Sequence, residues 1–155
     1  MNIYDILNQL NISYEEVSHK AIYSYEDALK ENIASKIDGV ECKNLFVKSK
    51  TKYYLIFIEA NKKADLKALS TKVEDSRLVF ASEEELKNIL NLEVGSVTPL
   101  GIINDKNNLV TILLDKELIG QKVLLHPNVN TKTISITLED LIKFIENRNH
   151  SYLLF

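Results

Sequence analysis

The stretch that decides the fold is residues 41–48, ECKNLFVK, followed by a polar turn at residues 49–52 and a second run at residues 53–58, YYLIFI. Two apolar runs of β-forming residues around a short polar turn predict a β-hairpin. The second run is apolar at every position, which predicts a strand buried on both faces at the centre of its sheet. Lys43 and Asn44 then stand where the first strand begins. A rigid strand end can hold a functional group steady, although a solvated surface lysine is the simpler interpretation of this stretch alone.

Helices and strands are interspersed along the rest of the chain without regular alternation. Apolar positions at helical spacing predict a helix at residues 2–10. Capping side chains predict further helices from Ser24, from Asp65, from Ser82 to Asn91 and from Thr137. Strands are predicted at residues 14–17, 78–80, 100–103, 109–114, 123–125 and 133–136, with one helical turn at 115–119. Residues 34–42 are expected to form a polar connection, and residues 151–155 receive no assignment. The pattern predicts a single α/β (α+β) domain over residues 1–155, with a mixed sheet.

The composition is that of an ordinary globular protein. The chain has 155 residues, 45% of them apolar and 26% charged, which is enough to build a substantial core. No run approaches the roughly 18 apolar residues that span a membrane, and the N-terminus lacks the basic start of a signal peptide. Cys42 is the single cysteine and permits no internal disulfide, as is common in a reducing compartment. We therefore expect a cytoplasmic location and no membrane partner.

Charge is unevenly distributed along the chain. The net charge is −3, which argues against a general nucleic-acid binder. Residues 43–72, however, contain eight lysines and two acidic residues, so this segment carries +6 and the remainder −9. A basic segment on an acidic body is typical of a surface that faces phosphate groups. A hairpin edge protected from aggregation by lysines would give the same pattern.

The potential metal ligands and nucleophiles are scattered. His19, Cys42, His126 and His150 show no short ligand spacing, so no metal site is expected. Cys42 could act as a nucleophile with His19 or His126 as its base, but no nucleophile motif surrounds it, and a lone cysteine is usually a small buried hydrophobe. The chain also lacks a phosphate-binding Gly-Lys-Ser/Thr loop and a dinucleotide fingerprint.

Residues 94–99, VGSVTP, form a turn-rich loop after a predicted helix. Gly95 allows the backbone to approach a ligand closely, and Pro99 stiffens the exit from the loop. Such a loop can present backbone N–H groups to a carbonyl or an oxyanion. A helix-to-strand turn that needs glycine and proline only for its geometry is the alternative.

A third polar feature begins at His126, where a predicted strand ends in residues 126–131, HPNVNT. His126, Asn130 and nearby threonines could line a small polar pocket, or they could cap backbone groups in a structural turn. His19, near another strand end, is equally open. His150, close to the C-terminus, is expected to be solvated.

Taken together, these segments resemble a known family. The resemblance rests on residues 42–47 (CKNLFV) as a lysine-bearing strand, 64–69 (ADLKAL) as the helix that follows, 80–82 (FAS) before an acidic helix, 95–99 (GSVTP) as a Gly-x-x-x-Pro loop, 103–105 (IND) and 126–131 (HPNVNT). In this order they are similar to the YbaK/ProX group of aminoacyl-tRNA deacylases, relatives of the editing insertion of bacterial prolyl-tRNA synthetase. The resemblance covers most of the chain and implies a mixed, mostly antiparallel sheet or barrel-like core flanked by helices.

The resemblance implies a trans-acting editing hydrolase that removes a small amino acid from mischarged tRNA(Pro), without a cofactor or metal. Asn44 after the strand lysine, together with the stretch at residues 126–131, is most similar to the branch that clears Ala-tRNA(Pro). The branch that clears Cys-tRNA(Pro) more often has threonine after this lysine. A deacylase for cysteine or serine, a non-catalytic module that binds aminoacyl-tRNA, and a small-molecule pocket protein unrelated to tRNA remain as alternatives.

The resemblance also implies roles for particular residues. Lys43, Asn44 and Gly95 are the implied catalytic residues. The implied substrate-binding residues are His19, Ser96, Val97, Thr98, Pro99, His126 and Asn130. The tRNA-binding residues that we expect from the basic segment are Lys48, Lys50, Lys52, Lys62 and Lys63. The expected partner is the acceptor end of mischarged tRNA(Pro), with prolyl-tRNA synthetase as a further candidate.

Overall fold

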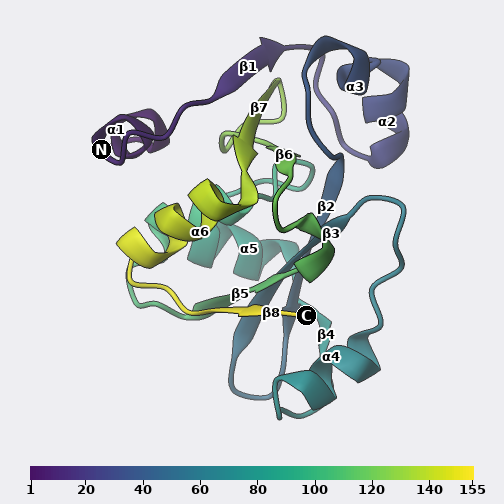
Figure 1. The fold of residues 1–155 in the computed structure, drawn as a ribbon. Helices are drawn as coiled ribbons and strands as arrows, with labels where there is room; N and C mark the ends of the chain where they lie inside the picture. Colours follow the sequence, from purple (N-terminus) through teal and green to yellow (C-terminus); the bar gives the residue numbers. More distant parts are fainter.

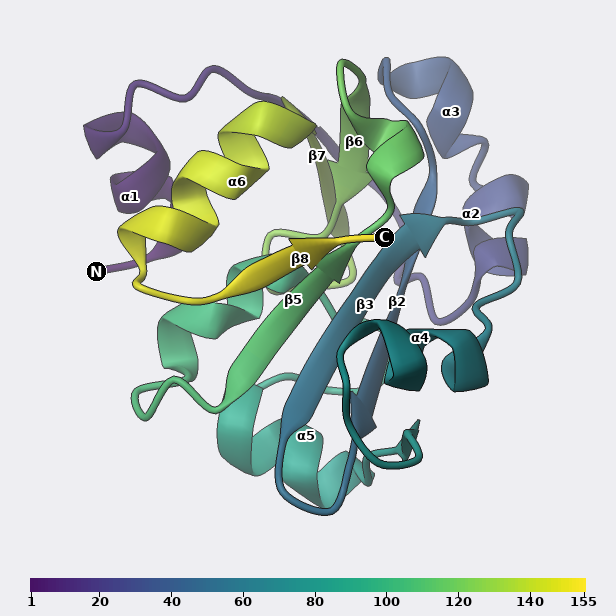
Figure 2. The ribbon, with the colours of Figure 1, turned by 60° about the horizontal axis from the view of Figure 1, so that its bottom comes forward.

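The computed structural model describes all 155 residues, and the predicted hairpin lies at the centre of its larger sheet. Across that sheet the five strands are β4 (Val79–Phe80), β2 (Cys42–Lys48), β3 (Tyr53–Glu59), β5 (Val110–Leu114) and β8 (Tyr152–Leu154). β2 pairs antiparallel with β3 and β4, whereas β5 and β8 continue the sheet in parallel pairings (Figure 2). β3 is the middle strand and is buried from Tyr54 to Ile58, so the prediction of a central strand is confirmed.

A second, three-stranded sheet stands beside the first (Figure 1). Its strands are antiparallel and follow the order β1 (Glu15–Ser18), β7 (Lys132–Thr137) and β6 (Lys122–Leu125). Val40 joins the two sheets through a parallel bridge to Val123, since its N–H donates to the Lys122 carbonyl and its carbonyl accepts from Leu124 N–H. The mixed, mostly antiparallel arrangement that the family resemblance implies is therefore confirmed.

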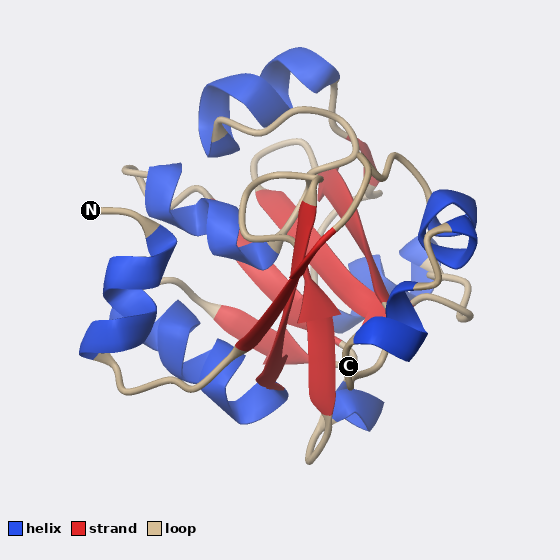
Figure 3. Cartoon of the chain, turned by 90° about the horizontal axis from the view of Figure 1, so that it is seen from above, coloured by secondary structure: helices blue, strands red, loops and turns tan.

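Helices surround the strands (Figure 3). The α-helices are α1 (Ile3–Gln9), α2 (Tyr25–Lys30), α3 (Ile33–Lys36), α4 (Leu66–Lys72), α5 (Glu83–Leu90) and α6 (Leu138–Asn147), and two 3₁₀ helices are η1 (Pro99–Asn104) and η2 (Lys116–Leu118). The predicted caps Ser24, Asp65, Ser82 and Thr137 each accept a hydrogen bond from a backbone N–H in the first turn of their helix. None of the helices is long and apolar enough to cross a membrane.

Apolar side chains gather in three clusters around the sheets. The largest contains 24 buried residues, drawn from α1, α5, η1 and α6 and from both sheets. A second lies under α4, where Leu69 meets Tyr54, Ile56 and Ile58 of the central strand. A third, of Ile22, Ile33, Ile37 and Leu124, holds α2 and α3 against β6. Ile22, Ile33 and Leu124 of this cluster also line a cavity beside the start of β2.

The structure corrects the assignment of residues 100–103, which form part of the 3₁₀ helix η1 instead of the expected strand. Thr98 caps the segment and Pro99 opens it, and proline has a fixed φ that suits a helical start and no N–H for a ladder. Gly101 N–H donates to the Thr98 carbonyl. The run is apolar because nearly all of it is buried, and a fully buried run has no periodicity that separates strand from helix. Similarly, the connection expected at residues 34–42 begins within the short helix α3.

His150 is buried, with 8% of its surface exposed, so the expectation of a solvated side chain was wrong. Its Nε2 lies 2.9 Å from Asp105 Oδ2, and its Nδ1 lies 2.9 Å from the Arg148 carbonyl oxygen. Burial raises the pKa of the Asp105 carboxyl, but hydrogen bonds from His150, Leu109 N–H and Val110 N–H outweigh it and lower the pKa overall. The pair fastens residues 151–155, which carry β8, to the start of β5.

Candidate active site

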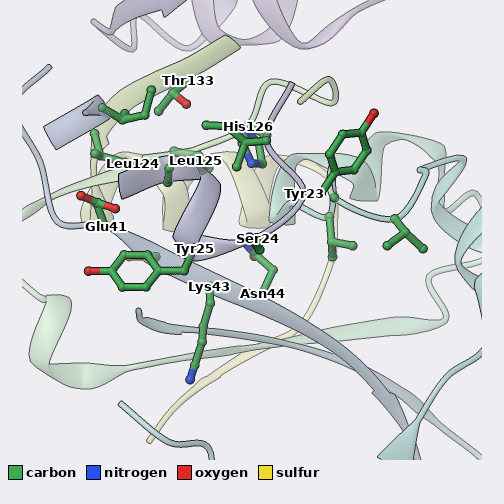
Figure 4. Close-up of a pocket in the computed structure, with 17 residues that line it drawn as sticks. Tyr23, Ser24, Tyr25, Glu41, Lys43, Asn44, Leu124, Leu125, His126 and Thr133 are labelled. Carbon is green, nitrogen blue, oxygen red and sulfur yellow. The ribbon is translucent and has the colours of Figure 1, made fainter. Parts of the chain in front are cut away.

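A cavity of about 310 Å³ lies where the start of β2, the segment leading into α2, the Gly95 loop and the end of β6 meet (Figure 4). Seventeen residues line it, ten of them hydrophobic. This volume is at the small end of the range for ligand pockets. The cavity brings together five of the residues singled out from the sequence, which are Lys43, Asn44, Gly95, Val97 and His126.

Lys43 and Asn44 lie at the start of β2, where pairing with β3 holds their backbone rigidly. Asn44 Oδ1 is buried and has no hydrogen-bond partner. Lys43 is half-buried and makes no ion pair, and its side chain extends away from His126 and Thr133 in Figure 4. A buried amide oxygen without a partner destabilises the protein. A ligand that donates a hydrogen bond to this oxygen would recover the lost free energy.

Gly95 is required by geometry. Its φ is +93°, and a Cβ there would lie 2.9 Å from Tyr23 Cδ1 and 3.1 Å from the Ile22 carbonyl oxygen. Any larger residue would therefore push the loop away from the segment before α2. The loop and this segment together form one side of the cavity, and Val97 lines it from the same loop.

The other loop residues face the scaffold. The Ser96 hydroxyl donates to the Glu93 carbonyl at 2.9 Å, and Thr98 Oγ1 accepts from Leu100 N–H at 3.3 Å. Pro99 is buried at the start of η1. None of these three side chains lines the cavity, so their part in the site is to shape the loop that carries Gly95 and Val97.

His126 projects into the cavity from the end of β6. Its Nδ1 lies 3.1 Å from the Lys132 carbonyl, which can only accept, so Nδ1 carries the proton and the neutral ring presents the Nε2 lone pair. Burial lowers the pKa of His126, the Lys132 carbonyl raises it, and nearby His19 lowers it, with a net decrease from 6.5. His126 is therefore a neutral acceptor near pH 7.

His19 does not line the cavity. Its Nδ1 donates to the Lys20 carbonyl at 2.8 Å, and its Nε2 accepts from the Thr133 hydroxyl at 2.8 Å. The Thr133 proton is thus directed at His19, and the oxygen lone pairs remain free on a side chain that does line the cavity. Asn130 also lies outside the lining, where its carbonyl accepts from Ile22 N–H and ties the turn to the segment before α2.

The polar cavity residues that were not singled out from the sequence as site residues are Tyr23, Ser24, Tyr25, Glu41 and Thr133. Glu41 Oε2 is buried without a partner, and burial raises the pKa of the carboxyl. The only sequence signal for Glu41 is its place two residues before Lys43 at the start of a strand. Thr133 alternates with apolar residues in β7 and looks like an ordinary strand residue.

Cys42 also reaches the cavity, but its thiol is inert. Burial raises its pKa strongly, and the carboxylates of Asp115 and Glu59 raise it further. The S–H donates to the Val40 carbonyl at 3.4 Å. Because the thiolate is the nucleophilic form, this environment disfavours the cysteine-nucleophile alternative. No group of three or more His, Cys, Asp or Glu side chains is arranged to hold a metal ion.

The five lysines expected to contact tRNA are divided between two environments. Lys48 pairs with Glu85 at 2.9 Å, and Lys62 pairs with Asp115 at 2.9 Å and with Glu117. Lys50, Lys52 and Lys63 are exposed. Lys48 stands about 17 Å from Lys43, at roughly 3.3 Å per strand residue, so the turn of the hairpin is remote from the cavity.

Comparison with known proteins identifies the class of protein to which this fold and site belong. A profile of the aminoacyl-tRNA editing domain matches residues 19–144. The chain is 34% identical to prolyl-tRNA editing protein ProX of Acetoanaerobium sticklandii, over 94% of this chain and 90% of that protein. It is 31% identical to prolyl-tRNA synthetase associated domain-containing protein 1 of Danio rerio, over 95% of this chain and 81% of that protein.

A solved structure gives the same result at the level of the fold. A crystal structure described as a candidate trans-editing enzyme for prolyl tRNA synthetase has a TM-score of 0.72 with this chain, at 17% identity over 97% of this chain and 92% of the other. The chain belongs to the aminoacyl-tRNA editing family. It is therefore an aminoacyl-tRNA hydrolase, and the family resemblance seen in the sequence is confirmed.

Proposed function

We propose that this protein hydrolyses the ester of tRNA(Pro) mischarged with alanine and thereby protects the fidelity of translation. The observation that carries the proposal is that one small cavity is lined by Lys43, the unpartnered Asn44 Oδ1, the Gly95 loop and the His126 lone pair. The relatives named as prolyl-tRNA editing and prolyl-tRNA synthetase associated proteins support tRNA(Pro) as the carrier.

A second site of this kind answers a physical problem in amino-acid selection. A synthetase pocket that holds proline also admits the smaller alanine, and one or two methylenes discriminate by only about 1–3 kcal/mol. A tight editing pocket reverses the order, because it admits alanine and excludes the larger ring. The mainly apolar lining of the cavity suits a small uncharged side chain.

The polar groups of the cavity are mostly acceptors, which suits a cationic amino group. Asn44 Oδ1, His126 Nε2 and the Thr133 oxygen all have free lone pairs, and Glu41 adds a carboxyl group. The α-ammonium of an alanyl ester has three N–H donors, whereas that of a prolyl ester has two. We expect N-acetylated Ala-tRNA(Pro) to resist hydrolysis, because acetylation removes the charge and two donors.

Lys43 is the cation of the site. It can bind the 3′-terminal phosphate or ribose, or it can stabilise the oxyanion that forms when water attacks the ester carbonyl. Backbone N–H groups of the Gly95 loop are the other candidates for the oxyanion. A hydroxyl of the terminal ribose can assist in activating the water, as can the neutral His126.

The tRNA body would approach over the basic segment. Lys50, Lys52 and Lys63 are free to meet acceptor-stem phosphates, whereas Lys48 and Lys62 would first have to leave their carboxylate partners. We expect affinity for tRNA to fall with salt, with a shallow slope because few lysines are free. Prolyl-tRNA synthetase, which produces the mischarged substrate, is the candidate protein partner.

The direct test measures release of labelled amino acid from Ala-, Cys-, Ser- and Pro-tRNA(Pro). We expect Ala-tRNA(Pro) to be hydrolysed fastest and Pro-tRNA(Pro) to be spared. Lys43→Ala should lose about 10²-fold or more in kcat/KM, whereas Lys106→Ala, which changes an exposed lysine in a turn, should remain fully active. If Cys-tRNA(Pro) or Ser-tRNA(Pro) were hydrolysed faster than Ala-tRNA(Pro), cysteine or serine would replace alanine as the proposed amino acid. Salt-dependent binding of tRNA without any turnover would favour a binding module, and no binding even at low salt would falsify the tRNA assignment.

A further inference from the structure

Tyr23 lines the cavity and is nevertheless 66% exposed, so it stands at the mouth of the cavity. Figure 4 shows its ring to one side of the other labelled side chains, with the hydroxyl pointing away from His126 and Asn44. The hydroxyl makes no hydrogen bond and the ring has no aromatic neighbour within the protein. Val94, which is also exposed, lines the cavity next to it.

The position of Tyr23 is held by its neighbours on both sides. Its N–H donates to Asp27 Oδ2 at 2.9 Å, and the N–H of the preceding residue, Ile22, donates to the Asn130 carbonyl at 3.0 Å. Cδ1 of the ring lies against Gly95, whose positive φ and missing Cβ allow the contact. An aromatic ring that is fixed at its backbone, supported along one edge and otherwise exposed is ready to receive a planar group.

We propose that Tyr23 is the stacking platform for the adenine base of the terminal nucleotide of the tRNA. This inference rests on the function proposed above, in which the aminoacyl ester and its ribose occupy the cavity. If the ester lies among the acceptors inside, the base attached to the same ribose must leave through the mouth, where Tyr23 is the exposed aromatic side chain. Tyr23 thus binds the part of the substrate that does not depend on the amino acid.

The energetics favour a base over an apolar partner. Every base has a π-face, and stacking on one aromatic side chain changes binding by roughly five- to hundredfold. A protein partner would require an apolar patch of several hundred square ångströms, whereas Tyr23 and Val94 stand beside polar Ser24 and Glu93. Since stacking acts equally before and after attack on the ester, Tyr23 affects substrate binding and leaves the chemical step unchanged.

The chain supplies a matched control. Phe80 is 63% exposed, close to the value for Tyr23, but lies on the edge strand β4 beside Val47, toward the remote end of β2. We expect Tyr23→Ala to raise KM for Ala-tRNA(Pro) about tenfold with kcat within twofold of wild type. Tyr23→Phe, which keeps the ring, and Phe80→Ala should both retain the wild-type KM, with thermal melts confirming that all variants fold.

A binding measurement separates this inference from the proposed function. Calorimetric titration with adenosine 5′-monophosphate and with ribose 5-phosphate measures what the base contributes, without any turnover. We expect wild type and Tyr23→Phe to prefer the nucleotide about tenfold, and Tyr23→Ala to bind the two ligands equally. This preference would support the platform even if Ala-tRNA(Pro) were not hydrolysed, in which case only the proposed substrate fails.

Three results would overturn the proposal that Tyr23 stacks on the terminal base. The first is a wild-type protein that shows no preference for the nucleotide over ribose 5-phosphate. The second is a Tyr23→Ala variant that loses affinity for both ligands in the same proportion. The third is a Tyr23→Ala variant that raises KM no more than Phe80→Ala does, while hydrolysis of Ala-tRNA(Pro) by the wild type proceeds normally.

Discussion

Strand β2 carries a lysine near each end, and the fold treats the two lysines in opposite ways. At the hairpin turn, Lys48 pairs with Glu85, which also accepts from the Tyr53 hydroxyl and from Ser82 N–H. At the other end, Lys43 has no carboxylate partner, and Asn44 Oδ1 beside it has no donor. Lys48 at one end of the strand is paired within the protein, whereas Lys43 and Asn44 Oδ1 at the other end remain available to a ligand.

The difference shows how a small scaffold can support an unsatisfied site. A buried polar atom without a partner costs about 1–3 kcal/mol, and Asn44 and Glu41 each contribute one. The cost falls on a strand whose neighbour β3 is buried on both faces and whose far end is fastened by Glu85. Stability is concentrated away from the cavity, so the polar groups that line it are free to serve binding and catalysis.

The largest effect should come from removing the unpaired lysine. Lys43→Ala should lower kcat/KM for Ala-tRNA(Pro) by about 10²-fold or more, because no other cation lines the cavity. The free energy of unfolding should not fall, since Lys43 makes no ion pair. Single-turnover kinetics at saturating enzyme divide the loss between its two roles: recovery at saturation assigns Lys43 to binding, and a persistent loss assigns it to chemistry. A variant with wild-type activity would remove Lys43 from the site.

The second-largest effect should come from His126, the hydrogen-bond acceptor that lines the cavity. Protonation of His126 Nε2 would abolish its lone pair, so kcat/KM should fall about tenfold per pH unit below the pKa of His126 and remain level above it. Because burial lowers that pKa, the break should lie below 6.5. A pH–rate profile checks the position of the break. An acidic limb that persists unchanged in His126→Ala would assign it to another group.

A smaller effect is expected from the loop that supports Tyr23. Gly95→Ala adds a Cβ 2.9 Å from the Tyr23 ring at a φ of +93°, whereas Gly120→Ala adds one at a φ of +81° with no atom within 4 Å. Both variants should lose about 1 kcal/mol of unfolding free energy from backbone strain. Only Gly95→Ala should also lose activity, by about tenfold, as the loop moves. Equal activity of the two variants would show that the loop position does not matter.

The smallest effect on activity should come from the satisfied end of the strand. Hydrogen bonds from Ser82, Tyr53 and Lys48 lower the pKa of Glu85 from its usual 4.5 to about 2. Glu85→Gln should therefore reduce the unfolding free energy by about 1–2 kcal/mol at neutral pH and leave kcat unchanged. Glu84→Gln, an exposed neighbour in the same helical turn, is the control.

The pH dependence of that stability difference follows from the direction of the shift. A carboxyl group whose pKa is lower in the folded state stabilises the protein above its unfolded pKa, and the contribution disappears as pH falls through the folded value. The difference between wild type and Glu85→Gln should therefore be complete above about pH 5 and vanish near pH 2. Chemical denaturation at several pH values measures it, and a difference independent of pH would contradict the charge-based explanation.

Local sequence signals predicted much of this architecture correctly. The hairpin, the caps at Ser24, Asp65, Ser82 and Thr137, and most strands were found because capping, turn chemistry and apolar alternation act between residues that are close in the chain. The same signals failed at residues 100–103, where burial on all sides hides the period. They also failed at His150, whose partner Asp105 lies 45 residues away.

Some residues of the candidate site could likewise be predicted from the sequence, and others could not. Lys43, Asn44, Gly95 and His126 could be singled out because each stands at a strand end or in a glycine loop, and the family resemblance joined them. Glu41, Thr133 and Tyr23 could not, because a carboxylate, a strand threonine and a surface tyrosine have no distinguishing neighbours in the sequence. Their importance comes from the cavity that they share.

By itself, the sequence determined the central hairpin, the positions of the capped helices and the family to which the chain belongs, since these depend on local propensity and on the order of short motifs. The tertiary structure alone decided which polar groups remain without partners. Lys48 and Lys43 have the same chemistry and lie on the same strand, but only folding brings Glu85 to one and leaves the other open. Hydrogen bonding and desolvation depend on distances in space, and those distances turn a lysine at a strand end into part of a site.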